Sequence, residues 1–115
     1  MVEDDAGVSK ALERLLNAEG FRVETFSSAE ALLASGTARD AACLILDVNL
    51  PGLSGFDLCK RLVALDACRP AIFITAYDTP AYRREAEEAR AFAFFTKPVA
   101  GRQLIAAVRE ACQLP

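Results

Sequence analysis

Five side chains that can bind metals or phosphate follow apolar runs of the sequence. They are Glu3, Asp4, Asp47, Thr75 and Lys97. Short apolar runs of this kind are typical of strands that are covered on both faces. In an open sheet of parallel strands, ligands bind beyond the carboxyl ends of the strands. If these runs belong to one such sheet, then three carboxylates, one hydroxyl and one ammonium group meet at the same edge.

This set of groups indicates phosphate chemistry supported by a metal ion. Three neighbouring carboxylates repel each other and need a cation, and their hard oxygen ligands suit Mg²⁺. Lys97 offers a positive charge and Thr75 a hydrogen bond to phosphoryl oxygens. Asp47 follows the central run and is the best candidate to attack phosphorus, because a carboxylate nucleophile forms an acyl phosphate.

Each of these residues also has an ordinary explanation when it is taken alone. Threonine is common in strands, a lysine is usually a solvated charge, and acids before a helix interact favourably with the helix dipole. Asp47 could simply begin a turn. Only their joint placement at one predicted edge favours a functional site.

Strands and helices alternate five times along the chain, with no linker or internal repeat. The spacing of apolar residues predicts helices at 6–20, 27–35, 55–65, 79–90 and 101–113, and strands at 1–2, 21–26, 43–46, 71–76 and 91–95. Alternation with apolar strands predicts an α/β fold in which helices cover both faces of a parallel sheet. Right-handed crossovers then make a doubly wound sheet the leading topology.

The bulk properties limit the possible classes of function. With 115 residues, of which 53% are hydrophobic and 25% charged, the chain is predicted to form one soluble globular domain. Its net charge of −3 argues against direct contact with nucleic acid. No apolar run approaches the roughly 20 residues of a membrane span, and we expect a cytoplasmic protein. The four cysteines include no CxxC spacing and the chain has no histidine, which disfavours a zinc site and any histidine-based catalysis.

Four motifs, "VEDD", "LILDVNLPGLSG", "FITA" and "FFTKPV", together resemble the receiver domains of two-component response regulators. The resemblance covers essentially the whole chain. It implies a flavodoxin-like, doubly wound (βα)5 fold with a five-stranded parallel sheet in the order 2-1-3-4-5. It also implies a single receiver domain over residues 1–115, with no output domain in this chain.

By this resemblance, Asp47 is the phosphoacceptor, which receives a phosphoryl group from a sensor histidine kinase or a phosphotransfer protein. Mg²⁺ would be bound by Glu3, Asp4 and Asp47 and by the backbone carbonyl of Asn49. Lys97 would bind the phosphoryl group. Such a domain is not an enzyme in the usual sense, because it catalyses only its own phosphorylation and dephosphorylation.

The resemblance also implies a switch. Thr75 would supply the switch hydroxyl, and Phe94 the aromatic side chain that rotates inward when the threonine moves. Asn49 and Tyr77 match the two positions that tune dephosphorylation, and the bond from Lys97 to its proline is expected to be cis. Signalling, and a possible homodimer, would use the face made by the helix at 79–90, the strand at 91–95 and the helix at 101–113.

The first predicted strand departs from the family pattern, because only Met1 and Val2 precede Glu3. A strand this short is expected to leave backbone groups of its neighbours unpaired, at a cost of about 1–3 kcal/mol for each buried group. A truncated start, dimerisation or a repacked amino terminus are the ways to explain or offset this.

Four other functions compete with the receiver interpretation. A degenerate receiver would act by protein contacts without phosphorylation. A haloacid dehalogenase-like phosphatase needs a second acid two residues after the nucleophile, where this chain has Asn49, and a cap domain for which the chain has no room. A flavodoxin-like flavin binder needs a Ser/Thr/Gly-rich loop after the first strand, and this sequence has no such loop. A nucleotide hydrolase is also disfavoured, because the sequence contains no GxxxxGK[ST] motif.

Overall fold

The computed structural model describes residues 1–67 and 69–113 and has an α/β fold. Its elements in chain order are α1 (Ala6–Ala18), α2 (Ala29–Ser35), the short 3₁₀ helix η1 (Ala38–Asp40), β1 (Leu44–Asp47), α3 (Gly55–Ala64), β2 (Ala71–Thr75), α4 (Pro80–Glu88), β3 (Ala93–Thr96) and α5 (Gly101–Cys112). The predicted alternation of helices and strands from residue 43 onward is therefore confirmed, with small differences at the boundaries.

The sheet contains three parallel strands in the order β1-β2-β3. The predicted five-stranded order is not confirmed, because the two amino-terminal segments form only isolated bridges in the described chain. Val2 forms isolated parallel bridges with Phe26 on one side and Leu46 on the other. A single residue cannot build a ladder for either neighbour, so residues 21–26 have only one bridged position instead of a strand.

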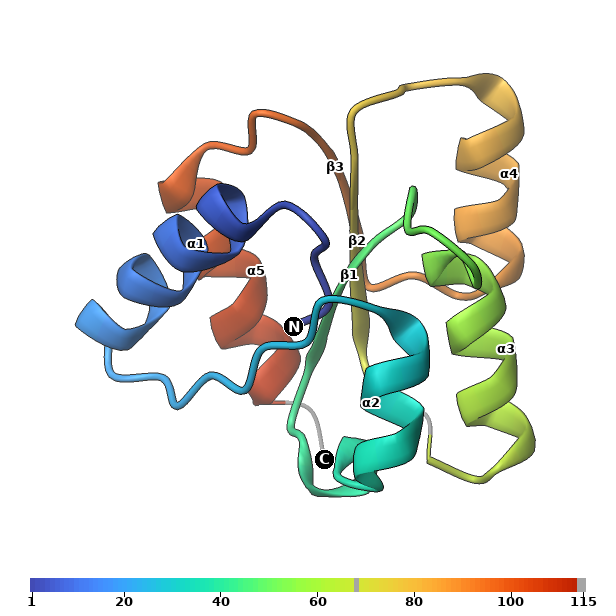
Figure 1. Ribbon diagram of the computed structural model, residues 1–115. Coiled ribbons are helices and arrows are strands. Elements are labelled where there is room, and N and C mark those ends of the chain that lie inside the picture. Colours follow the sequence, from blue (N-terminus) through green and yellow to red (C-terminus); the bar gives the residue numbers. More distant parts are fainter. Residues whose placement is uncertain (68, 114–115) are drawn as a thin grey trace.

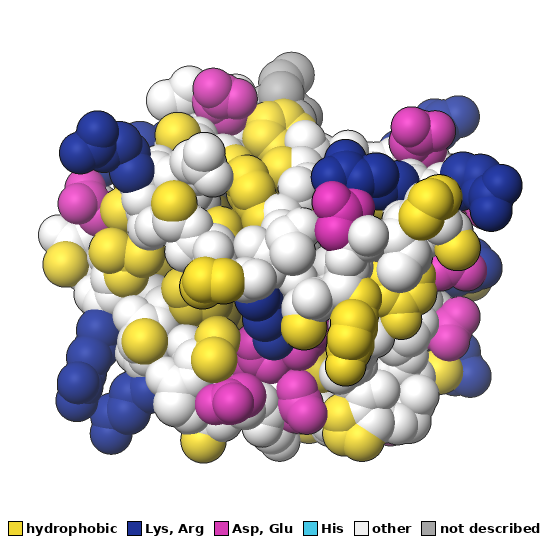
Figure 2. Space-filling model, turned by 90° about the horizontal axis from the view of Figure 1, so that it is seen from above, with side chains coloured by type: hydrophobic (Ala, Val, Ile, Leu, Met, Phe, Trp, Pro, Cys, Tyr) yellow, Lys and Arg dark blue, Asp and Glu magenta, His cyan; other side chains and the backbone are white. Residues whose placement is uncertain are grey.

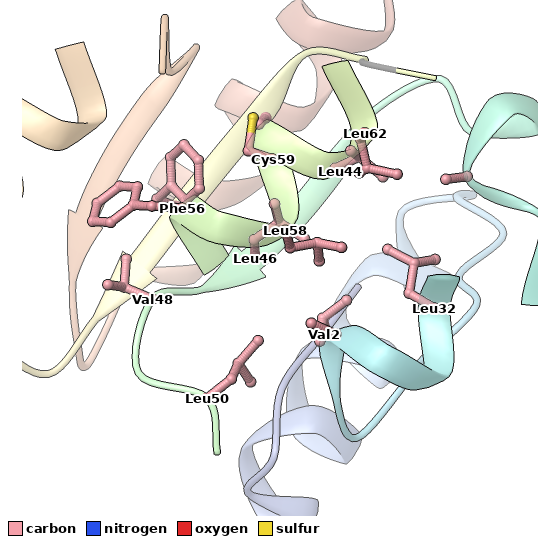
Figure 3. Close-up of a cluster of buried hydrophobic side chains, with 14 of the residues drawn as sticks. Val2, Leu32, Leu44, Leu46, Val48, Leu50, Phe56, Leu58, Cys59 and Leu62 are labelled. Carbon is pink, nitrogen blue, oxygen red and sulfur yellow. The ribbon is translucent and has the colours of Figure 1, made fainter. Parts of the chain in front are cut away.

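Helices cover both faces of the sheet (Figure 1). α1 and α5 lie on one face, where Leu12, Leu16, Leu104 and Val108 pack against Ile72 and other β-strand side chains. α2, α3 and α4 lie on the other face and form the second core layer. Figure 3 shows this second core with the labelled side chains Val2, Leu32, Leu44, Leu46, Val48, Leu50, Phe56, Leu58, Cys59 and Leu62. Val2 thus belongs to the core, although it is the second residue of the chain.

Polar side chains begin the helices at defined residues. Thr79 caps α4 by accepting a hydrogen bond from the Tyr82 N–H, and Pro80 takes the first helical position, as predicted. Ser28, and not Ser27 as the capping-box pattern predicted, caps α2. The longest helix, α1, has 13 residues, and none of the helices in residues 1–67 and 69–113 is long and apolar enough to cross a membrane.

A cavity of about 780 Å³ lies at the amino end of the sheet. We call it the amino-end cavity; its lining includes Met1, Phe21, Val23, Cys43 and Val108. The segments that surround it, residues 20–26 and 41–45, are those that would flank a longer first strand. The cavity therefore marks the space that the single bridged residue Val2 leaves open.

Candidate functional site

The carboxyl ends of the strands carry an acidic cluster. Carboxylate oxygens of Glu3, Asp4 and Asp47 lie within 4.8 Å of one another. Figure 2, which looks down on this edge of the molecule, shows Asp and Glu side chains gathered near the middle of the face with a basic side chain beside them. The structure thus brings together the three acids that the sequence analysis placed at one edge.

Four backbone hydrogen bonds fix the segment that carries the first two acids. The Val2 N–H donates to the Ile45 carbonyl at 2.8 Å, and the Asp47 N–H donates to the Val2 carbonyl at 3.0 Å. The Glu3 N–H donates to the Phe26 carbonyl at 3.0 Å, and the Phe26 N–H to Met1 at 2.8 Å. Glu3 and Asp47 therefore lie on neighbouring segments, and each residue is only 2% exposed.

The Lys97 side chain contacts two of the three acids. Its Nζ lies 2.7 Å from Glu3 Oε1 and 2.9 Å from Asp47 Oδ2. The Lys97 N–H also donates to the Thr75 carbonyl at 2.7 Å, which holds the lysine at the end of β2. The peptide bond between Lys97 and Pro98 is cis, as predicted. Among the described residues, Lys97 thus carries the only ammonium group that contacts these acids, and this group lies between Glu3 and Asp47.

Burial and the close contacts shift the pKa values of this group. Burial, together with the hydrogen-bonded Asp47 carboxylate, raises the pKa of Glu3 to about 7. Burial alone would also raise the pKa of Asp47, but hydrogen bonds from Glu3, Lys97 and the Asn49 N–H outweigh it and lower that pKa. Burial disfavours the Lys97 cation, yet its two carboxylate partners raise its pKa. At neutral pH Asp47 is therefore the ionised acid of the pair. Glu3 is then close to its pKa of about 7, so both its protonated and its ionised forms are present.

A chain of hydrogen bonds leads from Asp47 to α4. The Asn49 N–H donates to Asp47 Oδ1 at 3.0 Å. The Asn49 side chain accepts from the Thr75 hydroxyl at 2.7 Å and donates to the Tyr82 hydroxyl at 2.8 Å. The Tyr77 N–H donates to the Thr75 hydroxyl at 3.1 Å. The fully buried Thr75 hydroxyl is thus held next to the acid cluster by a side chain and a backbone group.

Two of the predicted site residues lie farther from the acids. The Tyr77 side chain is 59% exposed, and only its backbone joins the hydrogen-bond chain. Phe94 is half-buried against the α3–α4 core layer, and the Arg83 guanidinium lies 5.5 Å from its ring centroid. Arg83 in turn forms a two-point ion pair with Asp78, at 2.6 and 2.8 Å.

Sequence reasoning missed two residues that shape this site. Tyr82 lies in the predicted helix at 79–90, and nothing in its spacing links it to Asn49. Gly55 begins α3 against the backbone of residues 47 and 48, and a Cβ at this position would collide with the Asp47 carbonyl oxygen. A glycine shortly after a strand-ending acid was the available signal for this close approach.

The donor set fits a hard divalent cation. Glu3 Oε1 is buried and accepts no hydrogen bond of good geometry, although it lies in the ion pair with Lys97. Together with the oxygens of Asp4 and Asp47, it gives three carboxylate ligands in a space of 4.8 Å. Oxygen ligands of this kind suit Mg²⁺.

Comparisons with known proteins agree with this geometry. Residues 1–109 match the family model described as the response regulator receiver domain. Over 114 residues the chain is 40% identical to the response regulator protein TmoT of Ectopseudomonas mendocina, a match that covers 99% of this chain and 52% of TmoT. The chain therefore spans about half the length of the curated relatives that it matches.

Solved structures show the same fold. The response regulator StyR is 38% identical, with a TM-score of 0.88 over 97% of this chain and 57% of the StyR chain. The BeF3-activated receiver domain of DrrB, a Thermotoga maritima protein, is 28% identical, with a TM-score of 0.85 over 98% of this chain and 94% of that one.

Proposed function

The chain belongs to the response regulator receiver domain family, and from this premise we propose that Asp47 accepts a phosphoryl group and thereby switches a signalling surface. The observation that carries the proposal is the contact of Lys97 with both Glu3 and Asp47, at 2.7 and 2.9 Å. This contact assembles a nucleophilic carboxylate, a cation and a metal-binding acid at one point.

Asp47 is the proposed nucleophile because its lowered pKa keeps it ionised. One of its oxygens forms a bond to phosphorus while the bond from phosphorus to the donor nitrogen of a phosphohistidine breaks. The electron pair of that bond leaves with the imidazole, which takes up a proton, and Asp47 becomes an acyl phosphate. Lys97 stays beside the carboxylate and neutralises the charge that the phosphoryl group brings.

Glu3, Asp4, Asp47 and the Asn49 carbonyl are the proposed Mg²⁺ ligands. When bound, the ion would offset the repulsion between the carboxylates and the incoming phosphoryl oxygens. Lys97 would then give up its contact with Glu3 and keep its contact with Asp47, the residue that carries the phosphoryl group.

Thr75 and Phe94 are the proposed switch. The Thr75 hydroxyl, which donates to the Asn49 side chain, would turn to donate to a phosphoryl oxygen, and its movement would vacate space for the Phe94 ring. The output surface would be the α4–β3–α5 face, which could bind a partner or a second copy of the chain. Asn49 and Tyr77 would tune the lifetime of the acyl phosphate.

The donor partner in this proposal is a sensor histidine kinase or a phosphotransfer protein in the cytoplasm. We propose no direct contact of this domain with nucleic acid. The short first strand favours the alternative of a degenerate receiver, which would signal without phosphorylation, whereas the acids, Thr75 and Lys97 argue against it.

The proposal is tested by intact mass measurement after incubation with a small-molecule phosphodonor, with and without Mg²⁺. We expect one phosphoryl adduct on the wild-type protein, dependent on Mg²⁺, and none on Asp47→Asn. Asp57→Asn is the matched control, since Asp57 is an exposed acid in the first turn of α3, and this variant should keep the adduct. A stable adduct on folded Asp47→Asn, or none on the folded wild-type protein, would refute the assignment.

A further inference from the structure

The side chain of Asn49 is held between two hydroxyl groups. Its Oδ1 accepts the hydrogen bond from Thr75 at 2.7 Å, and its Nδ2 donates to Tyr82 at 2.8 Å. The Tyr82 ring is itself fixed, because it packs edge-on against the ring of Phe56, with centroids 6.0 Å apart. Tyr82 is thus a rigid anchor for a residue whose own backbone binds Asp47.

The Thr75 hydroxyl has one proton, and that proton is engaged. A hydroxyl donates a single hydrogen bond, and Thr75 donates its bond to Asn49. To donate to a phosphoryl group on Asp47, Thr75 must first release Asn49. Whatever holds the Asn49 amide in place therefore favours the arrangement without a phosphoryl group.

We propose that the Tyr82 hydroxyl is a positioning group that opposes the switch: by anchoring Asn49 it retains the Thr75 hydroxyl away from the phosphoryl site. This inference rests on the proposed function of Asp47. It adds a residue of α4 to the switch and makes the first turn of that helix a direct partner of the site.

The hydroxyl, and not the ring, carries this role. The ring packs against Phe56 and would remain in Tyr82→Phe. The phenol oxygen accepts from the Asn49 side-chain NH₂ group, and Tyr82→Phe removes this bond.

The test uses beryllofluoride as a phosphoryl analogue in the presence of Mg²⁺, with affinity measured by calorimetry or fluorine NMR. Loss of one neutral hydrogen bond that stabilises the unoccupied arrangement should tighten beryllofluoride binding to Tyr82→Phe by about fivefold. The same substitution is then made in an Asn49→Ala background, where the anchor has nothing to hold. There we expect less than about a twofold change, because the coupling between the two residues is removed.

Urea unfolding of all four proteins separates this role from a structural one. A packing defect would lower stability and weaken binding in both backgrounds alike, which would overturn the inference. An unchanged affinity of Tyr82→Phe, with wild-type binding intact, would also overturn it and leave the proposed function standing. Absence of beryllofluoride binding by the folded wild-type protein would overturn the proposed function, and this inference with it.

Discussion

The two ends of the Met1–Glu3 segment differ sharply in how they are packed. At the carboxyl end, Glu3 is 2% exposed and lies in ion-pair contact with Lys97. At the amino end, Met1 borders the amino-end cavity of about 780 Å³.

The difference shows how little of a strand the site requires. Val2 exchanges backbone hydrogen bonds with Ile45 and Asp47, Met1 and Glu3 exchange theirs with Phe26, and the Val2 side chain is fully buried in the core. This fixes the register of Glu3 next to Asp47. The bridges of Val2 lie next to the acids, so the contacts that position Glu3 do not depend on pairing at the amino end of the sheet.

The largest effect is expected from adding a methyl group at the packed end. In Gly55→Ala, the new Cβ would collide with the Asp47 carbonyl oxygen, a backbone atom that cannot move without shifting the nucleophile. We expect a loss of about 3 kcal/mol in the free energy of unfolding. Urea denaturation measures it, and a change below 1 kcal/mol would show that this end is looser than the structure indicates.

A matched pair of substitutions compares the two ends directly. Val2→Ala removes two buried methyl groups and should cost about 2 kcal/mol. Val23→Ala removes the same groups from the wall of the amino-end cavity, where Val23 is only partly buried, and should cost less than about 1 kcal/mol. Equal losses in urea denaturation would contradict the contrast between the ends.

The smallest effect on stability is expected from the protonation of Glu3. Glu3 keeps its proton to about pH 7 in the folded chain but loses it near 4.5 in the unfolded chain. The contribution of Glu3 to the free energy of unfolding is therefore complete below pH 4.5 and is lost as the pH rises through 7. The part that is lost between pH 6 and 8 is about 1 kcal/mol. At the other end, burial lowers the pKa of the Met1 amine, which acts in the opposite direction.

Thermal unfolding of wild type and Glu3→Gln at several pH values isolates the Glu3 contribution. The wild-type protein should lose more stability than Glu3→Gln between pH 6 and 8. Added Mg²⁺ should raise the wild-type midpoint more at pH 8 than at pH 6, because the metal needs the deprotonated acid. Parallel pH profiles for the two proteins would rule out a raised pKa at Glu3.

The sequence predicted the parts of the fold that depend on local pattern. β1 and β2 are short apolar runs, and the strand-ending acids, Thr75 and Lys97 follow from the rule that ligands bind at the carboxyl ends of parallel strands. Residues 21–26 failed as a strand because strand formation depends on a partner, and the partner here is one residue long. Local alternation cannot reveal this.

Tyr82 could not be predicted for a related reason. Its hydroxyl reaches Asn49 across 33 residues of sequence, through the packing of α4 on α3. Pattern analysis assigns a helix face, but it does not give the length and direction of one side chain. The shifted pKa of Glu3 depends likewise on burial and on two partners from other segments.

The hydrogen bond from the Met1 amine to the Glu24 carbonyl, at 2.7 Å, has a practical consequence for handling the protein. Any residue fused ahead of Met1 would begin at the wall of the amino-end cavity. A fused residue would also convert the Met1 ammonium group, which donates to the Glu24 carbonyl, into an amide. The choice of tag sequence at this terminus is therefore expected to affect the measured stability.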